Sequence, residues 1–237
     1  MNEFFDVLVF GAHPDDVELG CGGTVAKMVG QGKKVAIVDL TRGELGTRGS
    51  AELREQEAHT AAEILGVKTR INLRLKDGFF QCDLDSLLEV VTVIRKYKPS
   101  IVLANALADR HPDHGRGAEL VAQACFLSGL QKVETPDYPE IHRPTAVYHY
   151  IQDFERTPDL VVDITDYEKQ KMDAILAFSS QFFDPKSNEP ETPISTPAFL
   201  ERLVGRDLAM GRPCGFKAGE GFEILRPIGV DSLLDLF

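Results

Sequence analysis

Residues 7–10, Val7-Leu8-Val9-Phe10, form the stretch on which the prediction of the fold depends. The run is short, continuously apolar and rich in residues that favour β-structure, and Gly11 ends it. A strand that is buried on both faces has this composition, whereas a half-buried strand alternates apolar with polar residues. The segment from Leu19 to Gly32 then favours a helix. The chain therefore opens with a buried strand followed by a helix.

The alternation of strand and helix continues along the rest of the chain. Ser50 is a favourable N-cap, Gly66 ends the helix that Ser50 begins, and Pro99 ends the next helix. We expect further strands at 34–40, 69–73, 101–104, 146–151 and 160–164, and further helices at 50–65, 83–97, 115–129, 165–178 and 197–211. This order predicts an α/β protein with a mostly parallel sheet covered by helices on both faces. Because the chain has no internal repeat and no low-complexity linker, we expect a single domain over residues 1–237.

The composition narrows the class of protein and its environment. Of the 237 residues, 43% are hydrophobic and 27% are charged, which is ordinary for a globular protein. The net charge of −11 argues against a general nucleic-acid surface, which needs basic patches. No apolar run is long enough to cross a bilayer and the N-terminus does not resemble a signal peptide, so we expect no membrane association and a cytoplasmic location. We expect buried thiols, rather than disulfides or zinc ligands, from the four widely spaced cysteines, Cys21, Cys82, Cys125 and Cys214.

Two clusters of histidine and aspartate follow predicted strands. His13-Pro14-Asp15-Asp16 comes after the first strand, and His111-Pro112-Asp113-His114 comes after the strand at 101–104. In an open parallel sheet, ligands bind beyond the carboxyl ends of the strands. The fold is therefore expected to bring the two clusters together, although they are far apart in the sequence.

The two clusters contain the donors of a catalytic metal site. His13 and Asp16 offer nitrogen and oxygen ligands that suit Zn²⁺, and His114 would be the third ligand. Two histidines and one carboxylate with an open position are typical of catalytic rather than structural zinc. The same triad occurs in non-haem Fe(II) oxygenases, so an enzyme of that class is the alternative function and Fe²⁺ is the alternative metal.

The remaining residues of the clusters indicate a hydrolytic mechanism. Zinc lowers the pKa of bound water towards about 7, and Asp15 would take the water's proton as general base. His111 would either support the oxyanion or protonate the leaving amine, with Asp113 holding its ring. Arg54, near the start of the helix after the glycine-rich loop, is a candidate contact to the oxyanion or the substrate. A salt bridge on the helix surface is an equally good interpretation of Arg54.

Three glycines in the first helix, Gly20, Gly22 and Gly23, raise the alternative of a non-catalytic nucleotide-binding module. Their segment matches neither G-x-G-x-x-G nor the P-loop, which counts against that function. We expect these glycines instead to let the start of the helix pack closely against the metal-binding loop.

Both clusters, in their sequence context, resemble the signature of the LmbE/PIG-L family of zinc de-N-acetylases. The resemblance covers nearly the whole chain and is strongest to the deacetylase branch of bacillithiol biosynthesis. It is carried by the segments Gly11 to Gly23, Thr41 to Gly49, Leu103-Ala104-Asn105, Asp109-Arg110, His111 to His114 and Ser180-Gln181-Phe182.

The resemblance implies a Rossmann-like three-layer sandwich and a set of roles for the site. The residues concerned are His13, Asp16 and His114 as metal ligands, Asp15 as base, His111 assisted by Asp113 near the leaving group or oxyanion, and Arg54 near the carbonyl oxygen. The implied substrate is N-acetylglucosaminyl-malate, with other N-acetylglucosamine or mercapturate conjugates as alternatives. The resemblance also implies a homotrimer or homohexamer.

Arginines in the predicted site loops are consistent with an anionic substrate. They are Arg42, Arg48, Arg54, Arg110 and Arg116. Arginine suits carboxylates, of which malate carries two, although these arginines could equally neutralise neighbouring acids. We expect Arg48, Arg54 and Arg110, together with Asn105, to bind substrate. Pro193 stands where related chains are expected to carry an aromatic residue, which argues against a mobile aromatic side chain over the site at this position.

Overall fold

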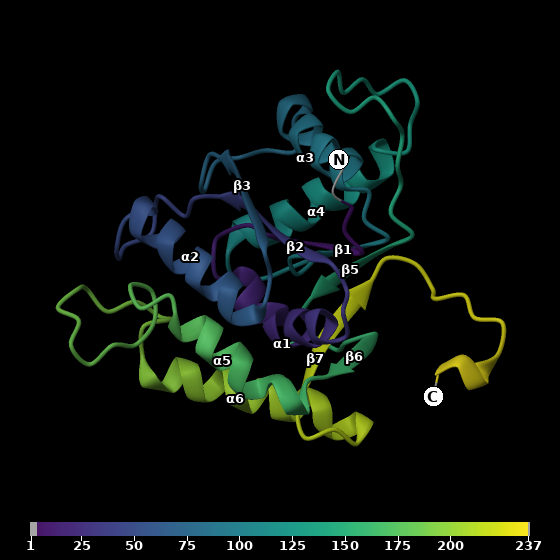
Figure 1. Ribbon diagram of the computed structural model, residues 1–237. Coiled ribbons are helices and arrows are strands. Elements are labelled where there is room, and N and C mark those ends of the chain that lie inside the picture. The colour runs from purple at the N-terminus through teal and green to yellow at the C-terminus, as the bar shows by residue number, and fades with distance from the viewer. Residues whose placement is uncertain (1–3, 237) are drawn as a thin grey trace.

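The computed structural model describes residues 4–236, which contain a seven-stranded sheet (Figure 1). The strands lie in the order β3-β2-β1-β4-β5-β7-β6. Their bounds are β1 Val7–Gly11, β2 Val35–Thr41, β3 Thr69–Leu75, β4 Ile101–Ala104, β5 Ala146–Tyr150, β6 Leu160–Asp163 and β7 Gly219–Ile224. Neighbouring strands from β3 to β5 pair in parallel, and β7 runs antiparallel to both β5 and β6. The expected α/β class with a mostly parallel sheet is confirmed.

Helices cover both faces of the sheet. The α-helices are α1 Asp16–Gly30, α2 Ala51–Leu65, α3 Leu84–Tyr97, α4 Pro112–Leu127, α5 Glu168–Leu176 and α6 Pro197–Gly211, and the 3-10 helices are η1 Thr165–Tyr167, η2 Arg212–Cys214 and η3 Leu233–Leu236. Helices α1, α2 and α5 pack together over one face, α3 and α4 cover the other, and α6 packs against β6 and β7 (Figure 1). Within residues 4–236, no helix combines the length and the apolar character needed to span a membrane.

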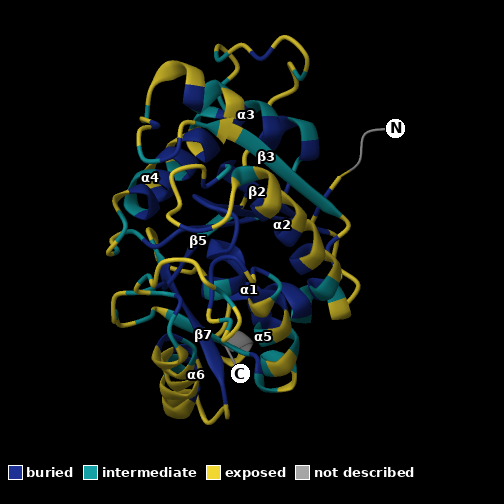
Figure 2. Cartoon of the chain, turned by 90° about the vertical axis from the view of Figure 1, so that its left-hand side faces the viewer, coloured by how far each residue is buried: buried dark blue, intermediate teal, exposed yellow. Residues whose placement is uncertain are grey.

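The first strand is buried on both of its faces. Val7 and Val9 belong to the apolar core that includes side chains of α1, α2 and α5, whereas Leu8 and Phe10 belong to the core that includes those of α3 and α4. Figure 2 shows the centre of the sheet in the dark blue of buried residues. Because successive side chains of a strand point to opposite faces, a continuously apolar run is what a sheet covered on both sides requires. The interpretation of residues 7–10 is confirmed.

Both His/Asp clusters extend into the first turns of helices. α1 begins at Asp16 and α4 at Pro112, where the apolar pattern indicated residues 19 and 115. His111 is the N-cap of α4, and its Nδ1 accepts a hydrogen bond from the backbone N–H of Asp113 at 3.2 Å. Proline suits the first helical position because an N–H there would have no partner within the helix. Apolar periodicity reports only the apolar part of a helix, so it misses these first turns, whose buried side chains are largely polar.

Strand β7 is absent from the sequence-based prediction because glycine is unfavourable inside strands. Gly219 and Gly221 are nevertheless required by packing, since a Cβ on Gly219 would lie 2.5 Å from Cγ1 of Val161 on the neighbouring strand β6. The buried carboxylate of Glu220 accepts a hydrogen bond of 2.9 Å from the backbone N–H of Gly23 in α1. β7 therefore tethers the helix that begins at the first cluster.

The glycines of α1 pack against the sheet and the segment after it. A Cβ on Gly20 would lie 2.2 Å from Cδ2 of Tyr150 on β5, and one on Gly23 would lie 2.9 Å from the side chain of Ile164. The expectation that these glycines pack against the metal-binding loop is therefore wrong. They let α1 approach β5 and the residue that follows β6.

The four cysteines are free thiols in different environments. Cys21 and Cys125 are buried, as expected, and Cys82 is partly buried. Cys214 is exposed, because it lies in the 3-10 turn η2 at the surface. The expectation of four buried thiols is therefore wrong for Cys214.

Replacing Gly20 with alanine is expected to destabilise the protein, because the new methyl group would overlap the ring of Tyr150. Overpacking of this kind costs about 1–3 kcal/mol, and each kcal/mol lowers the Tm of a chain of this size by roughly 2–4 °C. Calorimetry would measure the shift. The matched control is Gly205→Ala in α6, where no atom lies within 4 Å of the new Cβ. Alanine should maintain or raise the Tm there, and an equal loss in both variants would contradict the packing argument.

Candidate active site

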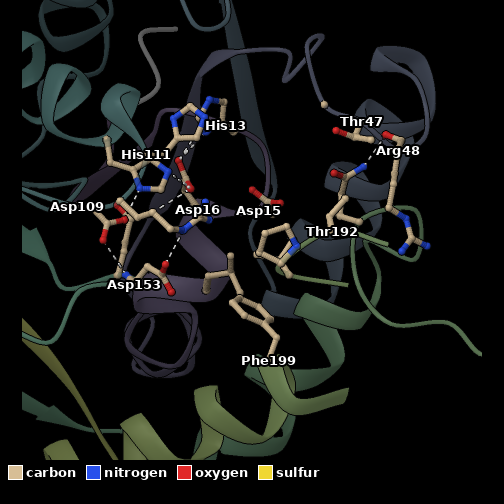
Figure 3. A pocket seen from close by; sticks show the side chains of 18 of the residues that line it. His13, Asp15, Asp16, Thr47, Arg48, Asp109, His111, Asp153, Thr192 and Phe199 are labelled. Carbon is tan, nitrogen blue, oxygen red and sulfur yellow. Dashed lines mark hydrogen bonds and ion pairs between the residues drawn. The ribbon is translucent and has the colours of Figure 1, made fainter. Parts of the chain in front are cut away.

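A pocket of about 320 Å³ lies at the carboxyl ends of the parallel strands (Figure 3). The loops after the first five strands each contribute to its wall, through His13, Leu45, Asp77, His111 and Gln152, and α6 contributes Phe199 and Leu203. The ring centroid of His13 lies 4.7 Å from that of His111 and 5.6 Å from that of His114. The fold thus brings together the two clusters that the sequence separates.

The side chains of His13, Asp16 and His114 converge in this pocket. Nδ1 of His13 lies 3.5 Å from Oδ2 of Asp16, and Nε2 of His114 lies 3.1 Å from Oδ1 of the same carboxylate. All three residues are buried. The carboxylate of Asp16 therefore lies between the two imidazoles, with one oxygen facing each of them.

The second nitrogen of each imidazole is held by carboxylates. Nε2 of His13 lies 3.1 Å from Asp77 and 3.3 Å from Asp113, and Nδ1 of His114 lies 2.5 Å from Asp109. Histidines that bind metals are usually oriented in this way, by a hydrogen bond from the far ring nitrogen to a carboxylate. Two nitrogen donors and one oxygen donor also match the chemistry of zinc. These donors fit a divalent metal ion.

Two other combinations of donors also include His13. The ligand atoms of His13, His111 and His114 lie within 4.8 Å of one another, as do those of His13, Asp77 and Asp113. We favour Asp16 over His111 as the third donor because its negative charge balances a cation and because each of its oxygens faces one imidazole. Asp77 and Asp113 both contact Nε2 of His13, and we interpret them as the carboxylates that orient its ring rather than as metal ligands.

The carboxylates of the pocket attract positive charge. Burial would lower the pKa of His13 and His114, but the surrounding carboxylates hold the pKa of His13 well above its ordinary value and raise that of His114 to about 9. Burial would raise the pKa of Asp16, but His114 and His13 hold it well below its usual range. The site therefore favours a positive species among its donors, as a metal-binding site must.

Asp15 is buried beside this donor set and its backbone is strained. It has φ 124°, in the left-handed region that residues with a Cβ rarely adopt, and such strain is concentrated at functional sites. Its Oδ2 accepts a hydrogen bond of 2.7 Å from Arg54, whose Nε also donates to the carbonyl of Pro14 at 2.9 Å. Burial raises the pKa of Asp15 to about 6, against the opposing charge of Arg54. Arg54 is itself buried, so its interpretation as a surface salt bridge is wrong.

Asp113 lies close to His111 in the chain, but its carboxylate is directed elsewhere. The carboxylate accepts a hydrogen bond from the backbone N–H of Gly78 at 2.8 Å and contacts His13 and Arg116. Its link to His111 runs instead through the backbone N–H that donates to Nδ1. The expectation that the Asp113 side chain holds the His111 ring is corrected, because the first turn of α4 points the carboxylate towards His13.

The arginines at the pocket are engaged with acids or other polar groups. Arg110 pairs with Asp153 at 2.7 Å. Arg48 donates to Ser187 at 2.9 Å, and its Nε lies 3.8 Å from Glu189. Both arginines line the pocket, as expected, but each has an acidic neighbour. Neutralisation of nearby acids therefore accounts for much of the arginine enrichment.

Two other arginines and one expected contact do not line the pocket. Arg42 pairs with Glu52, and Arg116 pairs with Asp113. Asn105 is fully buried behind the donor set, where it donates to Asp16. The expectation that Asn105 contacts substrate is corrected, because the residue is fully buried and does not line the pocket.

Several pocket residues are missing from the sequence-based prediction. Asp77 follows β3, so the rule that located the other site loops would have located it too. Phe199 and Leu203 lie on the inner side of α6 and look like ordinary core residues in the sequence. Pro193 lines the pocket in the loop before α6, and the aromatic side chain of this wall is Phe199 (Figure 3).

Comparison with known proteins places the chain in a family. It matches the PIG-L family model, described as GlcNAc-PI de-N-acetylase, over residues 8–125. It is 34% identical over 194 residues to the diacetylchitobiose deacetylase of Thermococcus kodakarensis, covering 76% of this chain and 72% of that protein. It is 27% identical over 189 residues to the 4-oxalmesaconate hydratase of Pseudomonas putida, covering 73% of each. The crystal structure of a conserved protein from Thermus thermophilus superposes with a TM-score of 0.86 at 33% identity, over 97% of this chain and 99% of that chain. The chain therefore belongs to the PIG-L family of de-N-acetylases.

Proposed function

We propose that this protein hydrolyses the N-acetyl group of an N-acetylglucosamine conjugate with the help of a bound zinc ion. The observation that carries the proposal is the position of Asp15. It is a buried carboxylate next to Asp16 in the chain, it lines the same pocket, and it is paired with Arg54. A metal-binding site alone fits many reactions, whereas a separate buried base beside the donors is what hydrolysis by an activated water needs.

His13, Asp16 and His114 would hold the metal through Nδ1, a carboxylate oxygen and Nε2. The bound ion would supply Lewis acidity, which polarises the acetyl carbonyl and makes water more acidic. Because Fe²⁺ is compatible with the same donors, zinc is proposed as the metal on the chemistry of the donor set and on the resemblance to zinc de-N-acetylases. Asp77, Asp113 and Asp109 keep the two imidazoles in the orientation that metal binding requires.

Asp15 would take the proton from the attacking water. Its pKa, raised to about 6 by burial against the charge of Arg54, leaves it ionised at neutral pH and still basic enough to accept a proton. Arg54 fixes the carboxylate through Oδ2 at 2.7 Å and lines the pocket itself. In this proposal Arg54 both orients the base and contacts the acetyl oxygen as negative charge develops there.

His111 would donate a hydrogen bond to the oxyanion. Burial and the charges of His13 and His114 lower its pKa, so the ring is neutral at neutral pH. Its Nδ1 accepts the backbone N–H of Asp113, so the proton of the neutral ring is assigned to Nε2. A neutral N–H donor can support an oxyanion, and the leaving amine would take the proton that Asp15 accepted from the water.

Two substrate classes compete for the part of the pocket that holds the leaving group. N-acetylglucosaminyl-malate, the bacillithiol precursor, is the prediction from the sequence resemblance, with Arg48 and Arg110 as its carboxylate contacts. A neutral second sugar is favoured by the acidic partners of both arginines and by the apolar wall of Phe199 and Leu203. The 34% identical relative is a diacetylchitobiose deacetylase, which also favours a neutral conjugate. We therefore propose both classes of conjugate as candidate substrates, to be compared in one assay.

Replacing Asp15 with asparagine should reduce acetate release by about 10²–10⁴-fold, the usual contribution of a general base. The amide keeps the size of the carboxylate but does not accept the proton. Metal content, measured by elemental analysis, should be unchanged, since Asp15 is not among the proposed ligands. Asp166→Asn, an exposed change outside the pocket, is the control. Full turnover by the Asp15 variant would remove it as the base.

Replacing His114 with alanine should weaken zinc binding by more than the roughly 10–100-fold that loss of an outer partner costs. Dialysis against a chelator followed by metal analysis would measure the loss, and acetate release should disappear with it. His59 is exposed and lies outside the pocket, so His59→Ala is the matched histidine control. A His114 variant that kept both zinc and turnover would overturn the ligand assignment.

Acetate release over a panel of substrates would identify the conjugate. The panel contains N-acetylglucosaminyl-malate, N,N′-diacetylchitobiose, free N-acetylglucosamine and a mercapturate conjugate. The anionic substrate would be supported if the protein prefers the malate conjugate and loses this preference in Arg48→Ala or Arg110→Ala. The neutral substrate would be supported if the protein prefers chitobiose and these changes have little effect. If no acetate is released, water addition to 4-oxalmesaconate and oxygen uptake test the hydratase and oxygenase alternatives.

A further inference from the structure

We propose that Asn105 and Gln152 act as positioning residues that clamp the carboxylate of Asp16 and thereby set the metal affinity of the site. The inference rests on the proposed function, because it takes Asp16 as a metal ligand. Asn105 does not line the pocket and Gln152 stands in its wall, and neither carboxamide is among the proposed metal ligands. Both would act through Asp16 by fixing its orientation.

Each oxygen of Asp16 receives one side-chain amide donor. Nδ2 of Asn105 donates to Oδ2 at 3.0 Å, and Nε2 of Gln152 donates to Oδ1 at 3.0 Å. Oδ2 also accepts the backbone N–H of His13 at 2.9 Å. The carboxylate is therefore held from three sides by uncharged donors, while its oxygens also face the imidazoles of His13 and His114.

The two carboxamides fix each other. Oε1 of Gln152 accepts hydrogen bonds from Nδ2 of Asn105 at 3.0 Å and from the backbone N–H of Ala106 at 3.2 Å. A reversed Gln152 amide would present its oxygen to Asp16, and a reversed Asn105 amide would face oxygen against oxygen at both of its contacts. The orientation of each N–H donor is thus determined. Asn105 is fully buried and Gln152 is 5% exposed, so solvent does not substitute for either donor.

The chain supplies this pair from adjacent strands. Asn105 directly follows β4, and Gln152 lies just after β5, its parallel neighbour. The backbone carbonyl of Gln152 accepts a hydrogen bond of 2.8 Å from Arg206 of α6. Two residues further on, Phe154 donates its backbone N–H to Asp109, the carboxylate that orients His114. The loop after β5 is therefore connected to two of the three proposed ligands.

Neutral donors suit this position for a physical reason. A cationic partner would compete with the metal for the charge of Asp16, and a water molecule would leave the side chain free to rotate. Amide N–H groups hold the carboxylate in place without removing its charge. Loss of an outer partner of a metal ligand generally lowers metal affinity by about 10–100-fold. We expect a loss of this size when either amide donor is removed.

Gln152→Met and Asn105→Ala test the proposal in the 237-residue chain. Methionine preserves the length of the Gln152 side chain but has no N–H donor. The metal-free proteins are titrated with Zn²⁺ in competition with a chromophoric chelator, and each variant should bind Zn²⁺ about 10–100-fold more weakly than the natural sequence. In proteins loaded with Co²⁺, the visible absorption bands should also change, since they report the geometry of the donors. Neither readout depends on substrate.

Gln181→Met is the matched control. Gln181 is also 5% exposed and lines the pocket, but its Nε2 donates to the carbonyl of Arg48 and to Ser180. It should keep the Zn²⁺ affinity and the Co²⁺ spectrum of the natural sequence. Melting temperatures of the metal-free forms identify any general destabilisation. If one of the two clamp variants does not fold, the other still tests the proposal.

The outcomes separate the clamp from the function on which it rests. If the natural sequence binds neither Zn²⁺ nor Fe²⁺ tightly, the proposed metal-dependent function fails. If it binds zinc and both clamp variants bind zinc equally well, only the clamp is overturned. An equal loss of affinity in Gln181→Met would also overturn it, because the effect would then not depend on contact with Asp16.

Discussion

The architecture of the site depends on keeping the carboxylate of Asp16 in the protein interior. This side chain is buried, and an isolated buried carboxylate costs several kcal/mol unless other groups compensate its charge and its hydrogen bonds. Its partners come from the ends of β1, β4 and β5 and from the start of α4. No single loop offers all of them, so the carboxylate is stable only where parallel strands end side by side. The same requirement brings the two His/Asp clusters together and produces a site that favours positive charge.

Packing at a distance keeps these groups in register. Gly20 allows α1 to approach the ring of Tyr150, and the hydroxyl of Tyr150 donates to the carbonyl of Phe10 at 2.8 Å. This contact connects β5 to β1 at the end of the strand that leads into the first cluster. Asp15 lies between β1 and α1 in the chain and has a strained backbone. Arg54 helps to hold this backbone by donating a hydrogen bond to the carbonyl of Pro14. The order of the proposed catalytic groups thus follows from core contacts whose own residues have no chemical role in the proposal.

The sequence predicts those parts of the fold and site that depend on local pattern. The run Val7 to Phe10 identifies a strand buried on both faces, and its position explains why His13 lies at a ligand-binding edge. β7 is not predictable in this way, because Gly219 has a low strand propensity. Glycine is needed there because a Cβ would clash with the side chain of Val161. The direction of a side chain is also beyond local pattern. Asn105 looks like a substrate contact in the sequence, yet the register of β4 with its neighbours turns it inwards to Asp16.

Membership of the PIG-L family does not by itself determine the reaction, because the relatives include both a deacetylase and a hydratase. The fold positions a set of donors that fit a metal ion, and the chemistry depends on the groups around it. In this chain those groups are a buried carboxylate with a raised pKa at Asp15, an arginine that orients it, and an imidazole at His111 whose hydrogen bond to the backbone leaves a donor on Nε2. A base, a cation and a neutral donor around one pocket match the needs of a tetrahedral oxyanion formed by water attack on an amide. This match, more than the donor set, is the physical reason for assigning hydrolysis.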